Sequence, residues 1–86
     1  MSASDHGAEV SRADAAIRSL AHARASLLEA SRAFGDIGDD EPEAGGAVGA
    51  QVRIAAILDR LDAMTARERA RRDAAELAAR AERGAP

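Results

Sequence analysis

The two histidines, His6 and His22, are the first candidates for acid–base chemistry in this sequence. A catalytic or metal-binding histidine needs a nucleophile, a carboxylate or further ligands that converge with it. His6 precedes the first strongly patterned segment, and His22 falls on the outer side of that segment, seven residues before Glu29. The chain has no cysteine, which excludes disulfides and thiolate ligands. We therefore expect surface histidines, no enzymatic activity, no cofactor and no metal.

Acidic residues gather in one short stretch. Its members are Asp36, Asp39, Asp40, Glu41 and Glu43. They lack the alternating Asp/Asn positions and the later Glu of a calcium-binding EF-hand loop. Gly45, Gly46 and Gly49 follow, but no strand precedes them, no Gly-Lys-Ser/Thr follows, and the nearby acids would repel phosphate. We expect a solvated acidic turn.

A cluster of arginines is the remaining candidate site. Its members are Arg67, Arg69, Arg71 and Arg72, with Glu68 among them. A solvated helix face is the default interpretation, contact with an acidic protein surface is the next, and contact with nucleic-acid phosphates is the last. Acids follow closely at Asp73 and Glu76, and the single aromatic residue, Phe34, offers no platform for bases.

Length and composition indicate a thin domain. Of the 86 residues, 24 are alanine, and apart from Met1 only fifteen are larger apolar residues. Short chains bury a small fraction of their surface, so their cores contribute little stability. We therefore expect another protein or a second copy of the chain to complete the core.

No apolar run is long enough to cross a bilayer, and the first residues lack the basic and apolar parts of a secretory signal. The default expectation is a cytoplasmic protein, or part of a phage or secretion assembly, with no membrane contact and no small-molecule ligand. All twelve basic residues are arginine, which with the abundant alanine indicates a GC-rich bacterial or phage gene.

The pattern predicts a first helix over residues 9–34, after a flexible N-terminus at residues 1–8; Asp5 is an alternative start. Apolar positions recur at alternating steps of three and four, which is typical of a coiled-coil seam. The seam positions are Val10, Ala13, Ile17, Leu20, Arg24, Leu27, Ser31 and Phe34, with Leu28 and several alanines beside them. The Arg24 side chain either extends outward to solvent along its aliphatic stem, or it pairs with a carboxylate of Asp59, of Asp62 or of a partner protein.

A second helix is predicted over residues 47–83, followed by a tail at 84–86. A loop at 35–46 joins the two helices, and Gly35 is expected to cap the end of the first. The apolar stripe of the second helix is Ile54, Ile57, Leu58, Leu61 and Met64. Beyond the stripe either the helix breaks near 64–65, where Thr65 and Glu68 form a capping-box pattern, or, as we favour, it continues as a charged protruding arm. Glu68–Arg72 and Glu76–Arg80 would stabilise this arm as i, i+4 pairs.

The sequence therefore predicts an all-α, antiparallel, coiled-coil-like hairpin with an acidic loop and a charged C-terminal arm. Its hypothetical function is a non-enzymatic protein–protein interaction module, such as an adaptor, chaperone or accessory subunit. The alternatives are a nucleic-acid-associated regulator that uses the arginine-rich arm, and a structural component of a phage or secretion assembly. The expected interaction seam is Val10, Ile17, Leu20, Leu27, Leu28, Phe34, Ile54, Ile57, Leu58, Leu61 and Met64.

Overall fold

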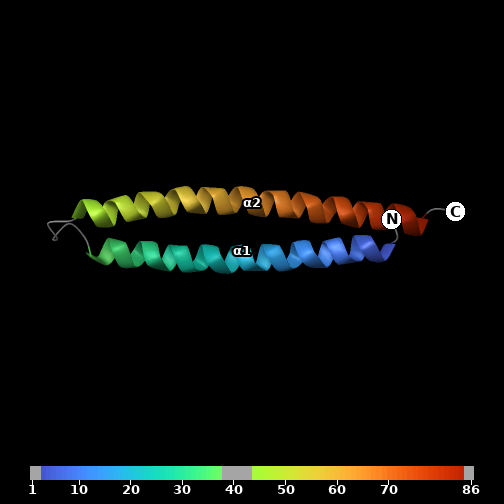
Figure 1. Cartoon of the computed structure of the whole chain (residues 1–86), viewed down its shortest axis with the longest axis horizontal. Coiled ribbons are helices and arrows are strands. Elements are labelled where there is room, and N and C mark those ends of the chain that lie inside the picture. The colour runs from blue at the N-terminus through green and yellow to red at the C-terminus, as the bar shows by residue number, and fades with distance from the viewer. Residues whose placement is uncertain (1–2, 38–43, 85–86) are drawn as a thin grey trace.

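The protein is a helical hairpin. The computed structural model describes residues 3–37 and 44–84, and these ranges contain two helices and no strand. Helix α1 spans Ala3–Ile37 and helix α2 spans Ala44–Gly84. The two helices lie side by side and antiparallel along their length (Figure 1). This confirms the predicted all-α hairpin.

The hairpin is a rod one helix pair thick. It measures 70 × 15 × 14 Å, with a radius of gyration of 19.4 Å. A compact domain of this length has a radius of gyration of about 12 Å. Its solvent-accessible surface of 6200 Å² also exceeds the roughly 4800 Å² typical of a folded monomer of this mass. In the described ranges no third layer covers the two helices.

Helix α1 is longer than the sequence pattern predicted. It begins at Ala3, six residues before Glu9, so residues 3–8 are helical rather than a flexible N-terminus; residues 1–2 lie outside the described part. Asp5 lies in the first turn, where a carboxylate interacts favourably with the helix dipole. At the other end α1 continues through Gly35 to Ile37, so this glycine is inside the helix and does not cap it.

Helix α2 is continuous through residues 64–65 and begins three residues before Ala47. The Thr65 hydroxyl donates a hydrogen bond to the Leu61 carbonyl at 2.8 Å, as threonine does within a helix. Thr65 therefore does not cap a new helix, and Glu68 instead contacts Arg71 at 3.4 Å. The rest of the expected loop, residues 38–43, and the end of the tail, residues 85–86, lie outside the described residues.

The C-terminal part of α2 packs against α1 and does not protrude (Figure 1). Alanines form this half of the interface: Ala13, Ala75 and Ala79 are 2%, 3% and 8% exposed. Small side chains let two helices approach closely, so this half needs no large apolar residue. The expectation of a free arm rested on the apolar stripe, which ends at Met64; it did not foresee an interface made by alanines beyond that point.

The seam of residues spaced alternately three and four apart runs along the whole of both helices. Every seam position of α1 from His6 to Phe34 is buried or half-buried, apart from Arg24. On α2 the seam continues well past Leu61. Its positions are Ala47, Gln51, Ile54, Leu58, Leu61, Thr65, Glu68, Arg72, Ala75, Ala79 and Glu82, and all but the last are buried or half-buried.

Candidate protein-interaction surface

The expected interaction seam falls into two groups. Nine of its eleven residues are buried or half-buried, and most of them face the other helix of the same hairpin. These nine are Val10, Ile17, Leu20, Leu27, Leu28, Phe34, Ile54, Leu58 and Leu61. The other two, Ile57 and Met64, lie outside the seam and are 41% and 42% exposed. The seam therefore holds the hairpin together, and a partner can reach only its edges and the residues beside it.

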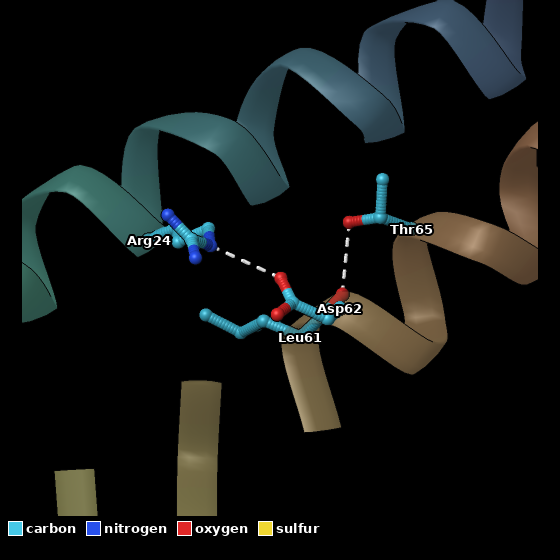
Figure 2. Close-up of polar contacts among 4 residues, drawn as sticks. All are labelled: Arg24, Leu61, Asp62 and Thr65. Carbon is cyan, nitrogen blue, oxygen red and sulfur yellow. Dashed lines mark hydrogen bonds and ion pairs between the residues drawn. The ribbon is translucent and has the colours of Figure 1, made fainter. Parts of the chain in front are cut away.

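Arg24 joins the two helices at the middle of the hairpin. Its Nε lies 3.0 Å from Oδ1 of Asp62, which selects one of the two alternatives left open by the sequence (Figure 2). The two side chains remain 47% and 55% exposed. An ion pair at this level of exposure contributes at most about 1 kcal/mol to stability. Its main consequence is positional, because it forms only in one register of α1 against α2.

Arg72 is a second polar residue in the seam. Its Nε contacts Asp14 of α1, and its guanidinium also lies 3.2 Å from Glu76. The contact with Asp14 is a charge–charge contact without hydrogen-bond geometry at Nε. In place of the expected pairs Glu68–Arg72 and Glu76–Arg80, Glu68 contacts Arg71 and Glu76 contacts Arg72.

The four clustered arginines do not form one basic face. Arg72 is in the seam, Arg71 contacts Glu68, and Arg67 and Arg69 are exposed on different sides of α2, because two residues advance the helix by about 200°. Arg69 lines the same open hollow as Asp62. A helix that tracks phosphates would align these side chains, and this one separates them.

His6 is buried, contrary to the expectation of a surface histidine in an N-terminal extension. It is 7% exposed, and its Nε2 lies 3.3 Å from Oε1 of Glu82. Its Nδ1 is buried and has no hydrogen-bond partner among the residues that the structure describes. The available signal was the heptad itself, since His6 lies one step of four before Val10. His22 is exposed, as expected.

The described residues contain no group of three or more histidine, aspartate or glutamate side chains that could hold a metal.

Open hollows on the surface distinguish two flanks of the hairpin. One hollow is lined by Glu9, Arg12, Ala13, Ala16, Glu68 and Arg71. Another, on the opposite flank, is lined by Ile17, Ala21, Arg24, Asp62, Thr65, Ala66 and Arg69. Each hollow contains side chains of both helices, so each flank is built by α1 and α2 together.

The exposed Ile57 and Met64 belong to the first flank. Seven residues turn a helix by about 700°, which is 20° short of two full turns, so positions seven apart stay on one side. On α2, Met64 and Ile57 lie seven and fourteen residues before Arg71, which lines the first hollow. On α1, Ala23 and Ala30 lie seven and fourteen residues after Ala16, which lines the same hollow. We call this surface the Met64 flank; its members are Ala16, Ala23, Ala30, Ile57 and Met64.

The chain matches no protein-family model, no curated protein and no solved structure. Neither described helix has a stretch apolar enough to cross a lipid bilayer.

Proposed function

We propose that this protein is a non-enzymatic protein–protein interaction module, a small adaptor, chaperone or accessory subunit that binds a helix on the open side of its hairpin. One observation carries the proposal. Among the residues whose burial the structure describes, six large apolar side chains are between 41% and 64% exposed, and only four apolar residues are buried, three of which are alanine. Two of the six, Ile57 and Met64, lie seven residues apart on the Met64 flank, and apolar surface exposed in this way is typical of interaction sites.

The described hairpin lacks a third layer. Two helices pack along one line, so the flanks of each seam stay in contact with water. Water is excluded from these flanks when a further helix packs beside them, as in bundles of three or four helices. A partner that binds the folded hairpin and not the unfolded chain also stabilises the fold by mass action.

The nucleic-acid alternative has less support. It relied on the arginine cluster at 67–72, in which Arg71 and Arg72 contact carboxylates. A role as a structural component of an assembly uses the same surface as the proposed module and differs from it mainly in copy number.

Sedimentation equilibrium across a wide concentration range, with helicity followed by circular dichroism, tests the proposal. Helicity that rises together with mass would support self-association. A weakly helical monomer at every concentration would indicate that the missing layer belongs to another protein. A fully helical monomer that unfolds cooperatively at high temperature and independently of concentration would contradict the proposal.

A further inference from the structure

The Met64 flank carries an apolar strip that a side chain from outside can reach. Ile57 and Met64 are 41% and 42% exposed on α2, while Ala23 and Ala30 of α1 are half-buried beside the seam. The small alanines leave room above α1. The strip is therefore shaped to receive larger apolar side chains from one more helix.

A row of arginines borders this strip on α2. Arg53, Arg60 and Arg67 are exposed, and each lies three or four residues from Ile57 or Met64, which makes them neighbours on the helix surface. Successive members are seven residues apart, or about 10.5 Å along the helix. Within the described part of the chain, none of the three forms an ion pair.

Of the acids near this row on α2, Glu68 lines the hollow at one end of the flank, where it contacts Arg71, and two others lie on the opposite side of the hairpin. Asp62 contacts Arg24 on the opposite flank, and Asp59, three residues earlier, lies on the same side as Asp62. On α1, Ser19 and Ser26 occupy the exposed positions along the outer edge of the Met64 flank. Halfway along the hairpin, the Met64 flank is therefore apolar between the two helices and positively charged along its α2 edge.

We infer that the Met64 flank is the docking surface for an acidic amphipathic helix of another protein. The inference deepens the proposed interaction function and rests on it. The partner helix spans at least two heptads, lays an apolar stripe on Ile57 and Met64, and carries carboxylates one heptad apart that face Arg53, Arg60 and Arg67. The seven-residue spacing of the arginines supports this occupant, because a second packed helix repeats its side chains with the same period.

A second copy of the chain fits this surface less well. In a two-fold dimer the same patch meets itself, so the arginine row of one copy would meet a surface whose middle carries no carboxylate to pair with it. A nucleic acid would neutralise the arginines, but it would leave Ile57 and Met64 against a charged backbone with no aromatic side chain to stack on bases. An acidic helix satisfies both the apolar strip and the charged edge.

Binding of synthetic helical peptides to the full chain tests the inference. One three-heptad peptide carries leucine at its seam positions and glutamate at the flanking positions; a matched peptide carries lysine in place of each glutamate. Fluorescence anisotropy is expected to show about tenfold tighter binding of the glutamate peptide, in low salt, from three exposed charge pairs. The variant R53E/R60E/R67E is expected to invert the preference, and this gain of binding excludes simple unfolding as the explanation.

Two matched variants locate the surface. R18E/R32E/R80E makes the same change of charge at exposed positions away from the Met64 flank, and it should keep the preference for the glutamate peptide. I57S/M64S should lose binding of both peptides. V52S/L77S removes two side chains that are 64% exposed on other sides of α2, and it should bind as the unaltered chain does.

The outcomes separate this inference from the proposed function. Peptide binding that R53E/R60E/R67E leaves unchanged would overturn the docking surface and leave the interaction module standing. A helical chain that binds neither peptide and does not self-associate would overturn both. A dimer that I57S/M64S dissociates would replace the acidic helix by a second copy. Tighter binding of duplex DNA than of the glutamate peptide, lost in R53E/R60E/R67E, would replace it by nucleic acid.

Discussion

Arg24 of α1 and Asp62 of α2 form an ion pair across the hairpin, with Nε and Oδ1 3.0 Å apart, at a seam position where the heptad pattern favours an apolar residue. Leucine at this position would bury more apolar surface. The charged pair instead specifies which turn of α2 lies beside Arg24. The contact therefore bears on the register of the hairpin more than on its stability.

A double-mutant cycle on Arg24→Ala and Asp62→Ala should give a coupling free energy of about 0.2–1 kcal/mol, because both side chains are about half exposed. Urea unfolding followed by circular dichroism measures it, and the coupling should fall at high salt. Asp59→Ala, combined with Arg24→Ala, is the matched control and should show no coupling. A coupling well above this range would mean that the pair also carries stability.

Leu20→Asp should abolish cooperative folding of the hairpin. Leu20 is a half-buried seam residue, so the change removes apolar burial and places a carboxylate between the helices, at a cost of about 2 kcal/mol or more. Loss of helicity and of any self-association is the expected readout. Leu77→Asp, at a residue 64% exposed, should leave both unchanged. Equal effects of the two substitutions would show that the seam is not where the structure places it.

Ala75→Leu should destabilise the hairpin by about 1–3 kcal/mol, because Ala75 is 3% exposed and a larger side chain would push the helices apart. Ala70→Leu makes the same change at an exposed position of α2, and leucine has nearly the helix propensity of alanine, so little change is expected there. Thermal unfolding compares the two variants. A rise in melting temperature for Ala75→Leu would show that the alanine half of the hairpin tolerates a wider spacing.

The seam of α1 could be predicted because large apolar residues occupy most of its positions, and an alternating three–four spacing is visible in hydropathy alone. The second half of the α2 seam could not, because Thr65, Glu68 and Arg72 occupy it and the rest is mainly alanine. These residues are buried or half-buried because α1 packs against them. The sequence of α2 alone does not show where α1 lies. Before Val10 the seam of α1 continues only through His6, a polar residue, so hydropathy alone does not extend the helix to Ala3.

Ile57 and Met64 illustrate a limit of hydropathy as evidence for position. Ile57 and Leu58 are adjacent, so only one of them fits a three–four seam, and the spacing from Ile54 to Leu61 allows either. Packing against α1 makes the choice, because Leu58 is half-buried and Ile57 is 41% exposed. The sequence places the expected interaction surface in the apolar seam, and it offers the dense arginine cluster at 67–72 as a possible contact for an acidic protein surface or for phosphates. The row that borders the Met64 flank has members seven residues apart, so it becomes visible only when the helix is followed along one side.

His6→Leu should raise the free energy of unfolding by about 1 kcal/mol. His6 occupies a buried seam position with an unpaired Nδ1, and an apolar residue there removes the cost of a buried polar atom without a partner. Glu82, whose side chain is 35% exposed, keeps access to water after the substitution. His22→Leu, at an exposed position, is the control and should change stability little. Destabilisation by His6→Leu would show that the contact with Glu82 contributes more than the buried Nδ1 costs.

Glycines within the helices offer the last prediction. Gly49→Ala should stabilise the hairpin by about 0.5–1 kcal/mol, because alanine loses less backbone entropy in a helix and an added Cβ would meet nothing within 4 Å. At Gly35 the added Cβ would lie 3.2 Å from Nε2 of Gln51, the atom that donates a hydrogen bond to the Ser31 carbonyl at 3.0 Å.

Gly35→Ala should therefore gain less than Gly49→Ala, since Gln51 must move and weaken a bond that joins the helices. Urea unfolding of both variants, and of each combined with Gln51→Ala, measures the difference. The combination should recover the full gain at Gly35, because it removes the crowded amide. Equal gains for the two single variants would show that the Gln51 side chain moves freely and does not help to position α2 on α1.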